Sequence, residues 1–146
     1  MVISGLGNSV VTAYDWQTGS QQWQATLGLP GAVPWATQIV GNTVLFGDSN
    51  LGDVWAVDLT TGAVTGHRTK LNLSGDAILN GVAYLTDDYL ANAIDNHGTT
   101  TLYAINPDDL TDLGSVALPE ADVEISVVSG HVVAVSQSDR IYVLQT

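Results

Sequence analysis

The stretch Ala13-Tyr-Asp-Trp-Gln-Thr-Gly-Ser-Gln-Gln-Trp23 contains the clearest structural signal in the chain. It combines an apolar strand end, a polar turn closed by Thr18-Gly19, and a second strand that opens on a large aromatic side chain. Weaker copies of the same pattern recur further along. The sequence is therefore interpreted as a short array of repeats.

Short runs of β-branched and aromatic residues, separated by Gly, Asn, Asp, Ser and Thr, extend over the whole chain. Helical periodicity is hard to find in any part of it. Gly41-Asn42, Asn80-Gly81 and Ser129-Gly130 lie between alternating runs and are typical of tight β-hairpins. The pattern predicts fourteen strands and an all-β fold.

The repeats have a regular length. Aligning Ala13, Ala56, Ala104 and Val143 gives steps of 43, 48 and 39 residues. Periods of about 40 to 50 residues with four strands per step are typical of β-propeller blades. Because one blade cannot bury both of its faces alone, neighbouring blades must stack. The expected organisation is a single domain over 1–146, with blades at about 1–28, 33–70, 76–118 and 123–146.

The expected strands, assigned A to D from the propeller axis outward, give blades of three, four, four and three strands, or about three and a half blades. Closed propellers have at least about four blades, so this chain alone is not expected to close. An unclosed array leaves exposed strand edges. We expect a head-to-tail homodimer, or a place within a larger propeller. Two copies would supply 28 strands, enough for seven blades, although the three-stranded ends do not join in phase.

The first stretch resembles the tryptophan-docking motif of the PQQ-like propeller repeats, Ala-x-Asp-x-x-Thr-Gly-x-x-x-Trp. The residues at its fixed positions are Ala13, Asp15, Thr18, Gly19 and Trp23. A second copy keeps Ala56, Asp58, Thr61 and Gly62, with Gly66 in place of the tryptophan. A third copy keeps Ala104 with Asn106 and has Asp109-Leu110 in place of Thr-Gly. The match weakens along the array.

Each motif residue also has a physical reason. A short Asp after a strand accepts hydrogen bonds from the backbone of the next turn, the Thr hydroxyl adds another, and Gly adopts the positive φ that closes it. A Trp on the following strand has enough area to cover the gap to the next blade, and its N–H then needs a partner. Trp23 is accordingly interpreted as a structural contact between blades rather than a ligand-stacking residue.

The resemblance implies a family that includes quinoprotein alcohol dehydrogenases and outer-membrane assembly scaffold lipoproteins. The enzymes, as the resemblance implies, hold their quinone between a Trp and a vicinal disulfide, but this chain has no cysteine. We therefore expect a non-enzymatic scaffold or binding module with a protein partner. The alternative is a subunit or fragment of a PQQ-type quinoprotein or sugar-handling enzyme. No signal-peptide pattern is present, so the sequence is compatible with a mature form, an excised piece or a cytosolic protein. The location is left open, with an extracytoplasmic or secreted one favoured.

The chain is strongly acidic, with 15 Asp and Glu against 3 Lys and Arg and a formal net charge of −12. Such a surface repels phosphate groups, so binding of nucleic acid or of an anionic membrane is not expected. The charge indicates simple solubility, adaptation to high salt, or binding of basic ligands or cations. If the protein is adapted to high salt, molar salt should raise its melting temperature. No apolar run approaches the length of a membrane span.

Two loops are candidates for ligand binding. Asp48, Asn50 and Asp53 offer three oxygen side chains in one loop, which suit Ca²⁺; no other cofactor is expected. A long polar insertion is a candidate binding loop through Asp87, Asp88, Asp95, Asn96 and His97. The ordinary alternatives are an inter-strand turn and a solvated connection. The three His residues lack zinc-ligand spacing, and no Gly-x-Ser-x-Gly motif or catalytic triad order is found.

Overall fold

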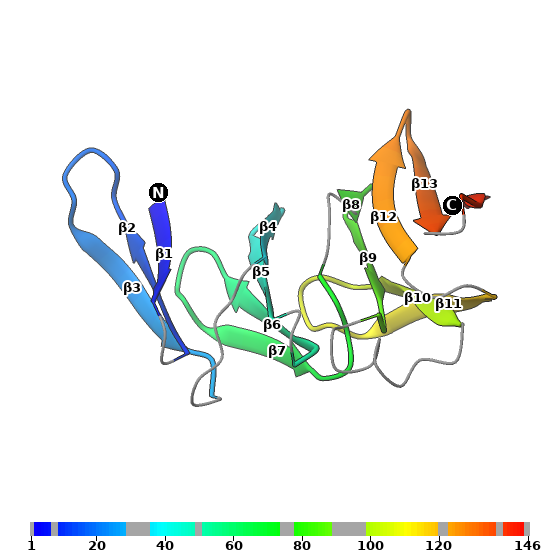
Figure 1. The fold of residues 1–146 in the computed structure, drawn as a ribbon. Helices are drawn as coiled ribbons and strands as arrows, with labels where there is room; N and C mark the ends of the chain where they lie inside the picture. The colour runs from blue at the N-terminus through cyan, green and yellow to red at the C-terminus, as the bar shows by residue number, and fades with distance from the viewer. Residues whose placement is uncertain are drawn as a thin grey trace.

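The computed structural model describes residues 2–6, 9–28, 36–48, 51–73, 78–88, 99–119, 123–136 and 139–144. Within these residues the chain forms fourteen strands and no helix, arranged as four antiparallel sheets in chain order (Figure 1). The all-β prediction is thus confirmed. No segment of the described residues forms a helix of the length and apolarity that a membrane crossing needs.

We call the four sheets blades 1 to 4. Blade 1 contains β1 (Val2–Leu6), β2 (Val10–Tyr14) and β3 (Gln21–Thr26). Blade 2 contains β4 (Ala36–Val40), β5 (Thr43–Asp48), β6 (Asp53–Asp58) and β7 (Val64–Arg68). Blade 3 contains β8 (Ile78–Leu79), β9 (Val82–Thr86), β10 (Thr100–Ile105) and β11 (Asp112–Leu118). Blade 4 contains β12 (Val123–Val128), β13 (His131–Ser136) and β14 (Ile141–Leu144).

The tight hairpins follow from residues that tolerate positive φ. Asn80-Gly81 and Ser129-Gly130 have positive φ at both positions, as a type I′ turn requires. At Gly41-Asn42 only the glycine has positive φ, as in a type II′ turn. These turns match the twist of the flanking strands, so consecutive strands pair as meanders.

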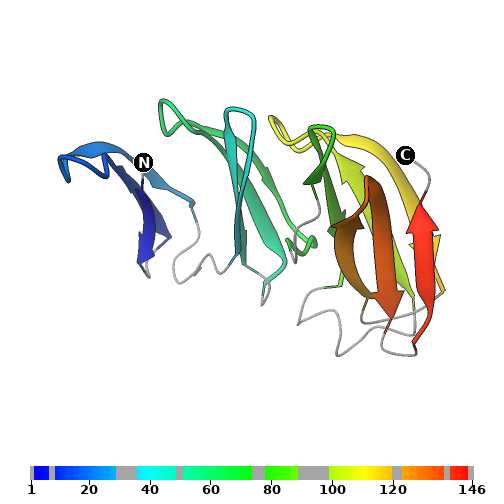
Figure 2. The same ribbon diagram turned by 90° about the horizontal axis from the view of Figure 1, so that it is seen from above.

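The core lies between the blades because the two middle sheets bury both faces. On β6, Trp55 and Val57 pack toward blade 1, whereas Val54 and Ala56 pack toward blade 3. This alternation is the period of two expected of a strand. Three apolar clusters result, one between each pair of consecutive blades. Figure 2 shows the four sheets standing one after another in an open row, with blades 1 and 4 at the ends.

We call the side of a blade that is turned toward the next blade its forward face, and the other side its rear face. Among the described residues no blade follows the forward face of blade 4. On β14 it exposes Ile141 and Val143, which are 67% and 61% accessible. The aligned residues of blade 2, Val54 and Ala56, are both 0% accessible. The open end of the row is therefore apolar where the middle of the row is core.

Candidate interaction site

The turn after β2 has the hydrogen bonds that the sequence predicts for Asp15. Its Oδ1 accepts from the Gln17 amide (2.9 Å), the Thr18 amide (2.8 Å) and the Thr18 hydroxyl (3.0 Å). The Gly19 amide donates to the Asp15 carbonyl at 2.8 Å, and Gly19 has a φ of +70°. These bonds, led by that from the Thr18 amide, lower the pKa of Asp15 below its ordinary value.

The turn after β6 repeats this geometry in blade 2. Asp58 Oδ1 accepts from the Thr60 amide (3.0 Å), the Thr61 amide (2.7 Å) and the Thr61 hydroxyl (2.8 Å). The Gly62 amide donates to the Asp58 carbonyl at 2.9 Å, with φ of +75° at Gly62. The Thr61 amide is the main reason why the pKa of Asp58 is also lowered.

The turn after β10 keeps the backbone of the motif with a leucine in the glycine position. The Leu110 amide donates to the Asn106 carbonyl at 2.9 Å, and Leu110 has a φ of +60°. For a leucine the left-handed conformation costs roughly 1–2 kcal/mol. The Leu110 side chain is nevertheless buried, at 1% accessible, within the core between blades 2 and 3. Packing thus offsets the backbone cost.

Strand register identifies the equivalent position on each outer strand. Ala13 lies opposite Trp23, Ala56 opposite Gly66 and Ala104 opposite Gly114. In all three blades a register shift follows the alanine. Trp23, Gly66 and Gly114 therefore occupy the same place in successive blades, and we call it the docking position.

In blade 1 the docking position is filled by an indole that contacts the turn of blade 2. Trp23 Nε1 donates to the Leu59 carbonyl at 2.8 Å, and the side chain is 7% accessible. The ring lies so close to Gly62 that a Cβ there would be 2.8 Å from it. A buried indole with its N–H satisfied by the backbone is a structural contact between blades.

In blade 2 the docking position holds the small residue, and the facing turn of blade 3 holds the large one. A Cβ at Gly66 would stand 2.9 Å from the Asp109 carbonyl oxygen and 3.1 Å from Leu110 Cγ. The blade 3 turn thus occupies the space that an indole would need. Arg68 binds this turn instead: its Nη1 donates to the Leu110 carbonyl at 3.3 Å and pairs with the Asp112 carboxylate.

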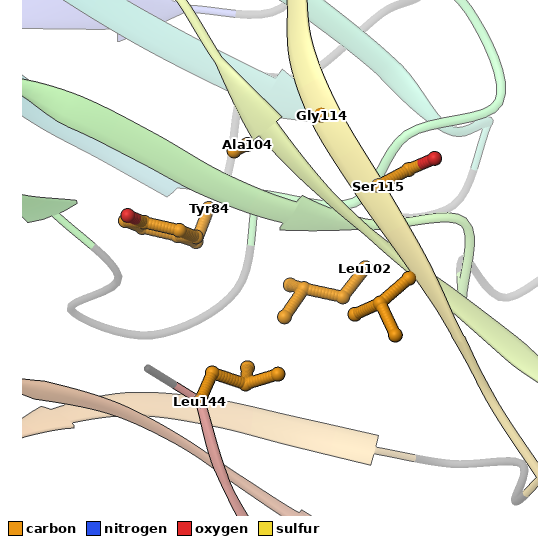
Figure 3. A pocket seen from close by; sticks show the side chains of 7 residues that line it. Tyr84, Leu102, Ala104, Gly114, Ser115 and Leu144 are labelled. Carbon is orange, nitrogen blue, oxygen red and sulfur yellow. The ribbon is translucent and has the colours of Figure 1, made fainter. Parts of the chain in front are cut away.

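In blade 3 the docking position is open. A Cβ at Gly114 would meet no atom within 4 Å in the part of the chain that the structure describes. A pocket lies beside it, and its lining residues are Tyr84, Leu102, Ala104, Gly114, Ser115, Val116 and Leu144. Figure 3 shows Leu102 of β10 and Leu144 of β14 on opposite sides of this space. The pocket therefore lies between blades 3 and 4.

The motif turn of blade 1 is also uncovered. Gly19 has nothing within 4 Å of a Cβ, whereas its counterpart Gly62 is buried under Trp23. Trp16, which aligns with Leu59, is 69% accessible. The hydrogen-bonded turn that receives an indole in blade 2 is thus present in blade 1 without a neighbour among the described residues.

The predicted calcium loop is only partly described. Asp48 and Asp53 lie opposite each other at the ends of β5 and β6, and both are buried. Asp53 Oδ1 lies 2.9 Å from His67 Nε2, and the His67 ring stacks on Trp55 with centroids 5.0 Å apart. Asn50 lies outside the described residues. Within the described part of the chain no group of three or more His, Cys, Asp or Glu could hold a metal ion. Calcium binding at this loop stays a prediction.

The predicted binding loop begins with two aspartates that hold blade 3 in place. Asp87 Oδ1 accepts from the Thr101 amide at 2.7 Å. Asp88 Oδ2 accepts from the Val123 amide at 2.9 Å, which joins the loop to blade 4. Asp95, Asn96 and His97 lie outside the described residues. A ligand for this loop therefore also stays a prediction.

Comparisons with known proteins support the fold. No protein family and no curated protein matches the chain. Among solved structures, it is similar to BamB from Moraxella catarrhalis (17% identity, TM-score 0.62, 97% of this chain, 48% of BamB). It is also similar to the dihydro-heme d1 dehydrogenase NirN, with 12% identity and a TM-score of 0.67 over 99% of this chain and 32% of NirN. A third similar structure is the Cps50 (Swd1) β-propeller domain of Myceliophteria thermophila, with 11% identity and a TM-score of 0.64 over 99% of this chain and 50% of that domain. The chain has a β-propeller fold and spans about half the length of BamB.

Proposed function

We propose that the chain is a non-enzymatic β-propeller scaffold or binding module of the PQQ-like kind, whose open ends are completed by further blades. The observation that carries the proposal is the exposed forward face of blade 4, where Ile141 and Val143 take the places of the buried Val54 and Ala56. Burying one such side chain contributes about 1.5–3 kcal/mol. A following blade would therefore stabilise this face.

The completing surface is the rear face of a blade 1, supplied by a second copy joined head to tail or by a longer propeller. On that face the Gln24 side-chain amide donates to the Thr12 hydroxyl at 3.2 Å. This bond uses one of the two amide N–H groups and the hydroxyl oxygen, so an adjoining blade that covers the face has to accept hydrogen bonds from the remaining N–H and O–H donors. Two copies would bring together eight sheets rather than the seven blades expected from the strand total, since each three-stranded sheet is a blade of its own.

The absolute mass in solution tests self-assembly, measured by light scattering at low and at molar salt. The proposal predicts twice the chain mass of 15.3 kDa for the wild type. Ile141→Asp places a charge in the interface and should give monomers. Leu113→Asp, at a residue 60% accessible on β11, is the matched control and should leave the dimer intact. A strictly monomeric wild type would contradict self-assembly, and the completing blades would have to belong to another polypeptide.

The second candidate function is that the chain forms part of an enzyme, because the similar solved structure NirN is a dehydrogenase. In that case the chain would be part of a quinoprotein or sugar-handling enzyme whose site needs further blades. Incubation with pyrroloquinoline quinone, followed by gel filtration and a near-ultraviolet spectrum, distinguishes the two. A quinone band that elutes with the protein would favour the enzyme, and its absence would favour the scaffold.

A further inference from the structure

A group of oxygen-bearing side chains lies where blade 3 packs against blade 4, beside the end of β9 and the start of β10. Its members are Asn72, Thr86, Asp88 and Thr100. We infer that these side chains bind a hard divalent cation of the calcium type between the two blades. The inference goes beyond the proposed assembly, because it concerns a contact between two blades of one chain and neither open end of the row.

The first observation is that three of these side chains carry a buried oxygen without a hydrogen bond. The atoms are the Thr86 hydroxyl, the Thr100 hydroxyl and the side-chain carbonyl of Asn72, and none has a hydrogen-bond partner within the described residues. Thr86 and Thr100 are each 1% accessible. Buried polar atoms are nearly always satisfied in folded proteins, so three such oxygens in one place indicate a bound ion or water.

Strand pairing places these oxygens close together. Thr86 lies opposite Leu102 on β10, and Thr100 is two residues from Leu102, so both hydroxyls are on the forward face of blade 3. Asn72 forms an antiparallel bridge with Thr86. Directly paired Cβ atoms are about 4.5–5.5 Å apart, and diagonal pairs about 7–8 Å. Because calcium binds oxygens at about 2.3–2.6 Å, this spacing suits one ion that contacts all three segments.

Asp88 supplies the negative charge of the site. Its Oδ2 accepts a hydrogen bond from the Val123 amide at 2.9 Å, so the carboxylate lies at the contact with blade 4. The Asn72 side-chain amide donates to the Asp88 carbonyl at 2.6 Å, which fixes the Asn72 side chain beside that carboxylate. A carboxylate, an amide carbonyl and two hydroxyls are all oxygen ligands, as calcium prefers. Asn72 and Asp88 are half-buried, so an ion can enter from their side.

The corresponding place between blades 2 and 3 is apolar. Gly47 lies opposite Val54 as Thr86 lies opposite Leu102, so the two positions correspond. The side chain of Leu73, which is 2% accessible, packs over Gly47, where a Cβ would stand 2.6 Å from Leu73 Cβ. Packing between blades therefore does not require a hydroxyl at this place, and Thr86 has a reason specific to the contact between blades 3 and 4.

Calcium titration of the full chain by isothermal calorimetry tests the site, at constant ionic strength and with magnesium present to occupy the acidic surface. We expect saturable binding of one ion per chain. Thr86→Val and Thr100→Val keep the shape of the side chain and remove its oxygen, so each should weaken calcium binding about tenfold or more. Thr101→Val is the matched control, because strand alternation places this side chain on the opposite face of β10, and it should bind calcium as the wild type does.

The melting temperature provides a second measurement. An ion that binds only the folded chain stabilises it, so calcium should raise the melting temperature of the wild type and of Thr101→Val, and raise that of Thr86→Val less. A wild type without saturable calcium binding, or Thr86→Val and Thr100→Val variants that bind as tightly as the wild type, would overturn the inference. Loss of binding in Asp48→Asn with retention in both threonine variants would place the ion at the loop after β5 and would also overturn it. The mass in solution decides self-assembly separately, so failure of one proposal is distinguishable from failure of the other.

Discussion

The interfaces between blades 1 and 2 and between blades 2 and 3 use the same backbone but place the large side chain on opposite sides. In the first, Trp23 is large and the turn residue Gly62 is small. In the second, the docking position is Gly66 and the turn residue is Leu110. The polar partner changes too: the indole N–H binds a turn carbonyl in one interface, and the Arg68 guanidinium does so in the other.

The motif thus specifies a volume to be filled rather than a tryptophan. Close packing of a protein interior requires the sum of the two facing side chains to fit, so a glycine on one side permits a bulky residue on the other. At the third docking position a Cβ on Gly114 would meet no atom of the described residues within 4 Å, so there the volume is unfilled.

Removing the indole should give the largest effect. Trp23→Ala deletes a side chain that is 7% accessible and leaves the Leu59 carbonyl without its donor, so we expect a loss of about 3–5 kcal/mol in unfolding free energy. Trp16→Ala, at a residue 69% accessible, is the control and should change stability by about 0.5 kcal/mol or less. Urea denaturation measures both. Similar losses for the two variants would show that Trp23 is not the key contact.

The next effect separates backbone conformation from docking. Gly62→Ala and Gly19→Ala both add a Cβ at positive φ, with φ of +75° and +70°. Only Gly62→Ala pushes that Cβ against the indole, at 2.8 Å. We expect Gly62→Ala to cost about 1–3 kcal/mol more than Gly19→Ala. Equal costs in thermal or urea unfolding would mean that only the turn conformation matters.

A smaller difference is expected between the two glycine docking positions. Gly66→Ala brings a Cβ to 2.9 Å from a backbone oxygen, which cannot move freely, and should cost about 1–3 kcal/mol. Gly114→Ala meets nothing within 4 Å and should stay within about 0.5 kcal/mol of the wild type. Urea denaturation midpoints of the two variants measure this difference in stability. A destabilised Gly114→Ala would show that the third docking position is already filled.

The smallest effect concerns the motif carboxylate and depends on pH. Folding lowers the pKa of Asp58 from its ordinary value of 3.8, chiefly through the hydrogen bond from the Thr61 amide. The carboxylate therefore contributes stability above pH 3.8, and the contribution is lost as the pH falls toward the folded pKa. The difference in melting temperature between wild type and Asp58→Asn should be present at pH 6 and shrink below about pH 4. A difference independent of pH would exclude this linkage.

Local sequence signals predicted the parts of the fold that depend on near neighbours. Hairpin dipeptides such as Asn80-Gly81 fix turn type within two residues, and strand alternation fixes which side is buried. The sequence also aligned Gly66 with Trp23, which the strand register reproduces. A short Asp followed by Thr-Gly was enough to predict the turn hydrogen bonds.

Contacts between blades could not be predicted in the same way. Leu110 in a glycine conformation has no local signal, because its reason is the space over Gly66, which lies more than forty residues earlier in the chain. The pairing of Arg68 with Asp112 likewise joins β7 of blade 2 to β11 of blade 3, two strands that the sequence does not place side by side. The available signal was that Gly66 is small where Trp23 is large, while Leu110 is large where Gly62 is small. That pattern can be recognised only once the strand register has shown which residues face each other.

The most direct test of reciprocal packing exchanges the large and small residues between blades 2 and 3. Gly66→Trp and Leu110→Gly are made singly and together, and the free energy of unfolding is measured by urea denaturation. Reciprocal packing predicts that each single variant is destabilised. The double variant, which copies the Trp23–Gly62 pair, should be less destabilised than the sum of the single variants by about 0.5–3 kcal/mol. Simple additivity of the two losses would contradict it.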